Sequence, residues 1–209
     1  MATLATYLLE VRRLLRDANG NYYSDSELTD YINDGRTRIV RDSGCNRILQ
    51  TITLTAGTET VDYLTLPQGI NTIDVINATV LWGNSRIVLS YLAWSDFNTK
   101  GRYWQNFTGR PSAFSTYGQG QIYFAPIPDI DYGVELDTIV VPVNLVLSTD
   151  AETLPIPFTS PVAYWAAHKA KYREQSYGEA DKFKETYVYE VRNAIGSTYT
   201  RRVRYPYNV

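Results

Sequence analysis

Residues 24–40 read SDSELTDYINDGRTRIV and predict an amphipathic helix. Ser24 and Glu27 have the spacing of a capping box, in which each side chain bonds the backbone of the other. The residues at helical spacing on one face are Leu28, Tyr31, Ile32, Gly35 and Ile39. Ser43-Gly44 follows, and a glycine in this position is typical of a helix end.

Three further helices are expected, one before this stretch and two near the C-terminus. Residues 3–18 carry an apolar stripe that ends at Asn19-Gly20. Ser160 is expected to cap a third helix, with Pro161 at its first position. A fourth helix is expected to follow a corner at residues 176–178 and to stop at Gly196. Helical signals therefore lie at both ends of the chain.

Between the helices the apolar period changes from helical spacing to two. Ile52 and Leu54 alternate with threonines, as in a half-buried strand. Glycine-containing turns at residues 83–85 and 118–120 predict hairpins between further strands. Prolines at positions 126, 128 and 142 limit the strand lengths. The middle of the chain is thus expected to form a small antiparallel sandwich or barrel.

The predicted fold class is α+β, because helices from both ends are expected to form one bundle around a β-rich insertion. We expect residues 1–46 plus 154–196 to form the bundle, residues 47–153 the insertion, and residues 197–209 an extended C-terminal arm. Phe183 and Tyr187 are expected to pack against the Leu28–Ile32 face. The predicted bundle core is Leu28, Tyr31, Ile32, Trp165, Phe183, Tyr187 and Val191.

Charge and cysteine content exclude several classes of protein. The formal net charge is −2, which provides no basic field for nucleic acid, and Cys45 is the single cysteine, which excludes an intramolecular disulfide. No apolar run reaches the roughly 18 residues of a membrane helix. Charged Glu10, Arg12 and Arg13 stand where a signal peptide would be apolar. We expect no membrane contact and synthesis in a reducing cytoplasm.

Few residues are candidates for catalysis. His168 is the single histidine, and we expect it to face solvent or an interface, because a zinc site or a triad needs further partners. A glycosidase needs two carboxylates about 5–9.5 Å apart. The acidic residues near one another are Asp129, Asp131, Glu135 and Asp137. Turns and strand faces explain these positions, so we expect no catalytic residue, no metal and no cofactor.

The last residues of the chain combine arginine and tyrosine without any acidic residue. Such side chains anchor protein interfaces, whereas disordered tails are poor in aromatic residues. We expect this tail to order when it docks on a partner; a frayed terminus and nucleic-acid contact are the alternatives. The residues assigned to docking are Arg201, Arg202, Arg204, Tyr205 and Tyr207.

The order of these elements resembles the head-to-tail adaptor proteins of tailed bacteriophages. The stretch Asn33-Asp34-Gly35-Arg36 resembles an early helix of that family. Gly109-Arg110-Pro111, together with Ile122–Asp129 and its Pro126-Ile127-Pro128-Asp129 exit, resembles the central hairpin of the family. Leu154-Pro155 and the helices that follow resemble its C-terminal helix pair. The length exceeds that of compact members, so the β insertion is expected to be enlarged.

The resemblance implies a structural virion protein without substrate or cofactor, assembled in the host cytoplasm. It would form a cyclic ring, twelvefold like the portal, at the neck of the virion. Its partners would be the portal protein, a tail or nozzle protein and further copies of itself, with DNA passing through the ring without specific binding. The arginine-rich sides of the first two helices are candidates for contact with acidic or polar patches on a neighbour; a solvated charged face is the alternative.

Two alternative functions remain open from the residues. A β-sandwich module that binds carbohydrate or protein would use exposed aromatic rings, and the candidates are Trp82, Trp94, Tyr103 and Trp104. A carboxylate-pair glycosidase would use the acidic residues named above.

Overall fold

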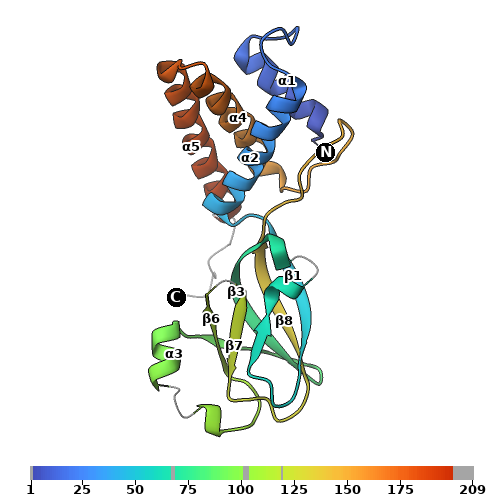
Figure 1. Cartoon of the computed structure of the whole chain (residues 1–209), viewed down its shortest axis with the longest axis vertical. Helices are drawn as coiled ribbons and strands as arrows, with labels where there is room; N and C mark the ends of the chain where they lie inside the picture. The colour runs from blue at the N-terminus through green and yellow to red at the C-terminus, as the bar shows by residue number, and fades with distance from the viewer. Residues whose placement is uncertain (1, 67–68, 101–103, 119, 200–209) are drawn as a thin grey trace, which may run out of the picture. The chain divides into compact units, whose positions relative to one another are not determined.

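The computed structural model describes residues 2–66, 69–100, 104–118 and 120–199 of the 209-residue chain. These residues form five α-helices and two four-stranded sheets, so the protein is α+β (Figure 1). The chain divides into a helical unit, Met1–Asn46 with Val141–Val209, and a β unit, Arg47–Val140. None of the described helices is long and apolar enough to cross a bilayer.

Residues 141–153 belong with the helices, although the sequence placed them in the β insertion. The last strand ends at Val140. Beyond it the backbone bonds to the first helix; for example, the Leu4 amide donates to the Asp150 carbonyl at 3.2 Å. A segment whose hydrogen bonds go to helices folds with them.

Helix α1 (Leu4–Leu15) ends about one turn before the predicted stop at Asn19-Gly20. Arg16 adopts the left-handed conformation, with φ of 57°, and closes the helix. The Asp17 carboxylate then stabilises the loop by accepting three amide hydrogens, from Asn21, Tyr22 and Tyr23. A side chain that binds the loop backbone in this way competes with further helix formation.

Helix α2 (Asp25–Ser43) begins and ends where the sequence predicts. The Ser24 hydroxyl accepts the Glu27 amide hydrogen at 3.2 Å, which is one half of the capping box. The Glu27 carboxylate accepts from the Tyr31 hydroxyl at 2.7 Å. Gly44, with φ of 61°, closes the helix.

Helix α4 (Ser160–Arg173) begins one residue earlier than predicted, with Thr159 at the cap position. The short helix η4 (Ile156–Phe158) runs directly into α4, so Thr159 already has helical dihedral angles. Its hydroxyl donates to the Ile156 carbonyl at 2.8 Å. Ser160 therefore lies inside the helix and makes no cap.

Helix α5 (Tyr177–Tyr199) continues through Gly196, where the sequence predicted its end. A glycine inside a helix costs only about 1 kcal/mol, which neighbouring bonds can offset. The hydroxyls of Ser197 and Thr198 donate to the Ala194 carbonyl at 2.9 and 2.8 Å. The predicted arm at 197–209 is therefore helical up to Tyr199.

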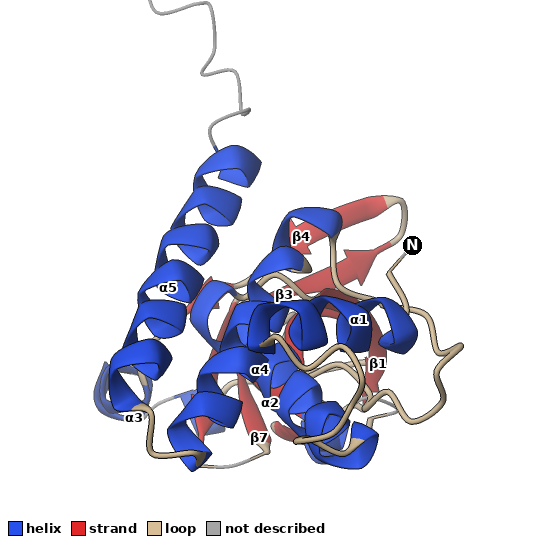
Figure 2. Cartoon of the chain, turned by 90° about the horizontal axis from the view of Figure 1, so that it is seen from above, coloured by secondary structure: helices blue, strands red, loops and turns tan. Residues whose placement is uncertain are grey.

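Helix α4 is the central element of the helical unit, where it contacts α1, α2 and α5 (Figure 2). Small side chains allow this close packing: Ala163, Ala166, Ala167 and Ala170 are all buried. Helix α2 approaches α4 at Gly35, where an added Cβ would lie 3.1 Å from the Val162 carbonyl oxygen. Glycine at this position thus sets the α2–α4 distance.

The first sheet of the β unit is antiparallel throughout and has the strand order β1-β8-β3-β4. Its strands are β1 (Arg47–Leu54), β8 (Tyr132–Val140), β3 (Thr72–Trp82) and β4 (Ser85–Val88). The second sheet has the order β2-β7-β6-β5. Its strands are β2 (Thr60–Asp62), β7 (Gln121–Ala125), β6 (Ala113–Tyr117) and β5 (Ser90–Tyr91).

The pairing of β5 with β6 is parallel, which differs from the antiparallel arrangement expected throughout. The connection between these strands contains helix α3 (Trp94–Lys100) and the short helix η3 (Trp104–Asn106), which is long enough for a crossover. Two further short helices, η1 (Tyr63–Thr65) and η2 (Gly69–Asn71), connect β2 to β3.

One buried cluster contains apolar side chains from both sheets. Ile52, Val80 and Leu136 come from the first sheet, while Phe114 and Phe124 come from the second. The period of two predicted from the threonine-rich stretch is seen in β1, where Ile52 and Leu54 are buried between exposed threonines. The alternation therefore directs one face of each sheet into a shared core.

Candidate assembly surfaces

Arg36 and Glu152 form a fully buried ion pair inside the helical unit. Each side chain is only 1% exposed. The Nε and Nη2 atoms of Arg36 each donate to a different Glu152 oxygen at 2.9 Å, and the Tyr7 hydroxyl adds a bond of 2.8 Å. This bidentate geometry is the strongest arrangement for an arginine–carboxylate pair. It joins α1 and α2 to the chain that returns from the β unit.

The network around this pair is arranged to keep Glu152 ionised. Burial alone raises the pKa of Glu152, but hydrogen bonds from Arg36 and from the Leu154 amide outweigh it and hold the pKa below its ordinary value. Burial, followed by the Glu152 charge, raises the pKa of Tyr7, so the phenol remains a donor. Arg36 Nη1 also donates to the Val143 carbonyl at 2.7 Å.

Residues 141–155, here called the return segment, are held against α2 by Asn33. Its side-chain nitrogen donates to the Leu145 carbonyl at 3.0 Å, and its oxygen accepts the Leu145 amide hydrogen at 2.9 Å. The Asp150 carboxylate accepts the amide hydrogens of Val146 and Leu147, each at 2.8 Å. The segment nevertheless exposes three apolar side chains: Val143, Val146 and Leu147. An ordered segment with exposed apolar groups is a candidate contact surface.

Sequence patterns did not reveal Glu152 as part of this site. It lies 116 positions from Arg36, and helix or strand periodicity carries no information over that separation. The one local sequence signal for this site was the stretch Asn33-Asp34-Gly35-Arg36, which carries the family resemblance. In the folded chain Asn33 binds the return segment, Gly35 allows α4 to approach, and Arg36 binds Glu152.

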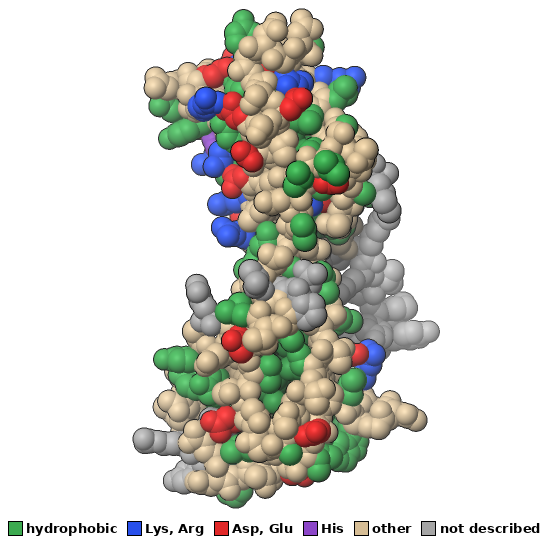
Figure 3. Space-filling view, turned by 45° about the vertical axis from the view of Figure 1, so that its right-hand side comes forward, with side chains coloured by type: hydrophobic (Ala, Val, Ile, Leu, Met, Phe, Trp, Pro, Cys, Tyr) green, Lys and Arg blue, Asp and Glu red, His purple; other side chains and the backbone are tan. Residues whose placement is uncertain are grey.

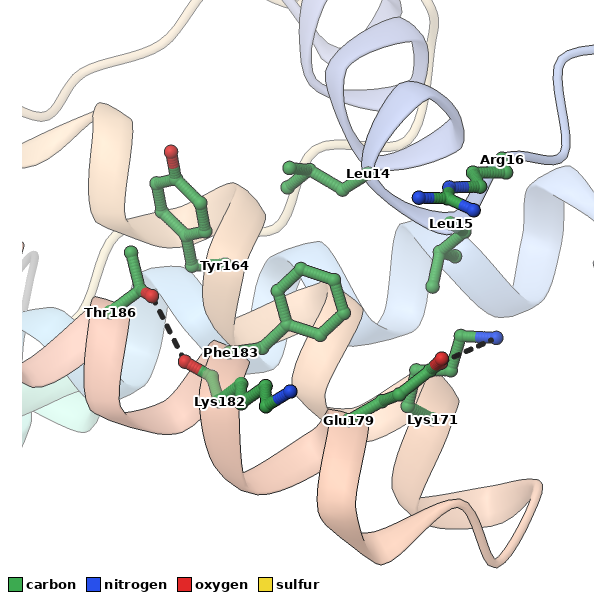
Figure 4. A pocket seen from close by; sticks show the side chains of 9 residues that line it. All are labelled: Leu14, Leu15, Arg16, Tyr164, Lys171, Glu179, Lys182, Phe183 and Thr186. Carbon is green, nitrogen blue, oxygen red and sulfur yellow. Dashed lines mark hydrogen bonds and ion pairs between the residues drawn. The ribbon is translucent and has the colours of Figure 1, made fainter.

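A groove of about 380 Å³ lies between α1, α4 and α5 (Figure 4). The lining residues are Leu14, Leu15, Arg16, Tyr164, Lys171, Glu179, Lys182, Phe183 and Thr186. The Phe183 ring points toward Leu14 and Leu15 (Figure 4). Lys171 is held by Glu174 at 2.8 Å and Glu179 at 3.4 Å. The groove therefore combines apolar side chains with a mainly basic rim.

Phe183 thus lies beside α1 and α4, away from the Leu28–Ile32 face on which the sequence placed it. The physical reason is that α5 packs chiefly on α4, so its first turns reach the end of α1. Tyr187 is buried; its ring centroid lies 5.0 Å from that of Trp165, and its hydroxyl donates to Asp42 at 2.9 Å. Among the other predicted core residues, Leu28, Ile32 and Val191 are buried, while Tyr31 and Trp165 are partly buried.

Comparison with protein families accounts for nearly the whole chain. The sequence model of the SU10 adaptor protein family matches residues 2–208. The chain belongs to this family. Comparison with curated proteins gives no significant match.

Membership confirms the resemblance to bacteriophage head-to-tail adaptors that the sequence indicated. The adaptor is a structural component of the virion that contacts other head or tail proteins. The match extends through the helical unit and the β unit, so both belong to the family pattern.

Three arginines of the first two helices form ion pairs within the adaptor's own chain. Arg12 pairs with Asp17 at 3.1 Å and with Asp25 at 2.6 Å. Arg38 pairs with Asp42 at 2.9 Å, and Arg36 is buried. Figure 3 shows basic and acidic side chains lying next to one another on the helical unit. The expectation that these faces contact a neighbour is therefore wrong for Arg36, which is buried, and stays a prediction for Arg12 and Arg38.

The four carboxylates considered as acid–base candidates each make a contact within the β unit of the adaptor. Asp129 accepts from Tyr132 at 2.6 Å, Asp131 accepts from the Ala56 amide at 2.8 Å, Glu135 pairs with Arg86 at 3.0 Å, and Asp137 pairs with Arg47. The Tyr132 hydroxyl is the largest influence that lowers the pKa of Asp129. Each carboxylate therefore stabilises a turn or the outer face of a sheet.

His168 is buried, although the sequence suggested a solvent-facing or interface position. Its Nδ1 atom lies 2.9 Å from the Ala180 carbonyl oxygen, so the ring connects α4 to α5. Within the described part of the chain no group of three or more His, Cys, Asp or Glu side chains is arranged to hold a metal ion. Cys45 is partly buried, and burial raises the pKa of its thiol.

Two of the tryptophans considered for carbohydrate binding, Trp82 and Trp94, pack onto other aromatic rings. Trp94, the first residue of helix α3, has its ring centroid 4.5 Å from that of Tyr117 and 4.7 Å from that of Tyr123. Trp82 stacks on Tyr132 at 5.6 Å. Trp104 begins the short helix η3. Tyr103, the fourth aromatic candidate, lies outside the described residues. So do the residues assigned to docking: Arg201, Arg202, Arg204, Tyr205 and Tyr207.

Proposed function

We propose that this protein assembles as a closed ring beneath the portal vertex and joins the phage head to the tail. The observation that carries the proposal is the match of the SU10 adaptor family over residues 2–208. In this proposal the helices act as one bundle, and the two sheets act as a sandwich-like insertion. The ring is twelvefold, like the portal, and DNA leaves the head through its channel.

A closed ring requires two unlike and complementary faces on each subunit. The helical unit offers two surfaces of different chemistry. One is the groove between α1, α4 and α5, which has a basic rim. The other is the return segment, which exposes Val143, Val146 and Leu147. Val146 lines a pocket together with the acidic residues Asp25 and Asp30. These differences support a head-to-tail arrangement of subunits.

The C-terminal tail is proposed to bind the portal. Arginine guanidinium groups form bidentate hydrogen bonds with carboxylates, and tyrosine rings supply rigid contact area. The residues concerned are Arg201, Arg202, Arg204, Tyr205 and Tyr207. The net charge of −2 suits a channel that passes DNA, since each neutralised phosphate would add affinity and slow transit.

The mass of the purified protein, measured alone and after mixing with a portal ring, tests this function. We expect a stoichiometric complex of adaptor and portal. Deletion of residues 200–209 should leave the melting temperature of the adaptor unchanged but abolish the complex, because the deletion keeps the whole of α5 as described, Tyr177–Tyr199.

A matched variant separates charge from geometry in the tail. Replacement of Arg201, Arg202 and Arg204 by lysine preserves the charge but removes the bidentate geometry, so binding should be weakened rather than lost. Full portal binding by the truncated protein would contradict the docking role of the tail. A protein that stays monomeric with the portal present would contradict the adaptor function itself.

A further inference from the structure

The first sheet of the β unit has a long strand at its edge that lacks the usual protection against pairing. Strand β1 pairs with β8 in continuous register over eight residues, without a bulge. In the described residues no strand lies on its other side. The residues from Ile48 to Leu54 include neither a charge nor a proline. Proteins normally block such edges with lysine, proline, bulges or very short strands.

The remaining edge strands of the β unit are shorter. Strands β2 and β5, at the edges of the second sheet, have three and two residues. Strand β4, at the opposite edge of the first sheet, has four. Within the described part of the chain, Ile48–Leu54 is therefore the longest stretch of edge strand that has a neighbouring strand on one side only, and this indicates that another strand covers it in the assembled protein.

We propose that β1 pairs with strand β4 of a neighbouring copy of this chain, so that the first sheets of adjacent subunits join edge to edge. This inference rests on the proposed ring and specifies one contact between its subunits. The two edges are different surfaces of one sheet, as a head-to-tail contact requires.

The chain directions allow this pairing. All three strand pairs of the sheet are antiparallel, so β1 and β4 run in opposite directions. Placing β4 of one copy beside β1 of the next therefore creates a further antiparallel pair. Because the sheet has an even number of strands, the alternation continues from copy to copy without a parallel pair.

Exposed apolar side chains at the two edges match each other. Leu49 on β1 is 64% exposed and Val88 on β4 is 63% exposed. Thr51, Glu135, Thr79 and Val88 lie in one row across the sheet, so Val88 shares its face with Thr51 and hence with Leu49. The two side chains would meet as a cross-strand pair between copies.

Charges do not oppose this register. When Val88 of the neighbouring copy lies opposite Leu49, its Arg86 lies opposite the uncharged Thr51. Arg86 is 67% exposed and pairs with Glu135 of its own sheet. No like charges are therefore brought face to face by the pairing.

Cysteine cross-linking tests the contact in the full-length protein after it has assembled with the portal. Cα atoms of directly opposed residues in antiparallel strands lie about 4.5–5.5 Å apart, within the range of a disulfide. In a Cys45→Ser background, the double variant Leu49→Cys with Val88→Cys should give a ladder of covalent oligomers on oxidation. The double variant Thr51→Cys with Val88→Cys tests the register shifted by two residues, in which Val88 lies opposite Thr51.

The controls separate this contact from chance collisions and from a twofold contact. Leu49→Cys with Ile130→Cys should give no ladder, because Ile130 is exposed but lies outside the strands. A dimer formed by the Leu49→Cys single variant would show that β1 pairs with itself and would overturn the proposal. The variant Leu49→Lys should reduce the assembled fraction at least tenfold without lowering the melting temperature of the subunit.

The outcome also distinguishes this inference from the proposed function. If the wild-type protein assembles with the portal but neither double variant cross-links and Leu49→Lys assembles normally, the edge pairing is wrong and the adaptor function stands. If the wild-type protein forms no assembly, alone or with the portal, the proposed function fails and the pairing fails with it.

Discussion

The substitution Glu152→Gln should remove much of the stability of the helical unit. Glutamine has nearly the same shape as glutamate but carries no charge. Arg36, only 1% exposed, would then be a buried cation without a counter-ion. Breaking a buried ion pair from one side costs about 3–5 kcal/mol, because the remaining charge is left uncompensated. This is a large part of the roughly 5–15 kcal/mol that stabilises a typical domain.

Urea unfolding followed by far-ultraviolet circular dichroism measures this loss, since four of the five described α-helices lie in the helical unit. The two units can unfold separately, so the helical transition is analysed on its own. The matched control is Asp34→Asn, the same carboxylate-to-amide change on a side chain that is 47% exposed. It retains an acceptor for Trp165 and should cost no more than about 1 kcal/mol.

A double variant shows whether the loss arises from the pair. In Arg36→Met with Glu152→Gln no buried charge remains at this site, so the destabilisation should be smaller than the sum of the two single effects by about 0.5–3 kcal/mol. A loss below about 1 kcal/mol for Glu152→Gln alone would refute the reasoning. It would mean that water or a rearranged partner compensates Arg36 without the carboxylate.

Three further predictions concern the helical unit. The folded-state pKa of Glu152 lies below its ordinary value of about 4.3, so its contribution to stability should be complete above that pH and lost as the pH falls through the folded-state pKa. Urea unfolding across this range should therefore show a stability difference between wild type and Glu152→Gln that narrows on acidification. Phe183→Ala should lower the free energy of unfolding by only about 1–2 kcal/mol, because Phe183 is half-buried in the groove. A loss of about 3–5 kcal/mol in thermal or urea unfolding would place its ring in the core. Gly35→Leu should destabilise the helical unit by about 3 kcal/mol or more, because the new side chain overlaps Val162 and Trp165, whereas Gly178→Ala has open space around it and should be neutral or slightly stabilising. Equal effects of the two substitutions on the melting temperature would contradict the close approach of α2 to α4.

Local signals were sufficient for the four helices of the helical unit and for the strand around Ile52, but not for the short strands β2 and β5. The capping serine Ser24, the stop at Gly44 and the alternation around Ile52 each depend on interactions within a few residues. Errors at element ends came from contacts that the local pattern does not contain. Asp17 binds the loop after α1, and η4 continues into α4 through Thr159.

Tertiary structure alone decided which distant residues meet. Glu152 is unremarkable in its own stretch of sequence and becomes the counter-ion of Arg36 only when the return segment lies on α2. His168 and Arg36 are polar residues that periodicity could assign equally to a surface, yet both are buried with a bonded partner. Similarly, β1 became an edge strand only through the order in which the strands pair.

The physical reason is the range of the forces involved. Helix and strand formation depends on dihedral preferences and on hydrogen bonds between near neighbours, which the order of residues encodes directly. Burial of a charge depends instead on whether a partner at any sequence distance can satisfy it, and the chain must close a long loop to bring that partner close. The sequence by itself therefore determined an α+β protein with the element order of the adaptor family, while the folded chain decided that Arg36 and Glu152 hold its helical unit together and that β1 is left open at its edge.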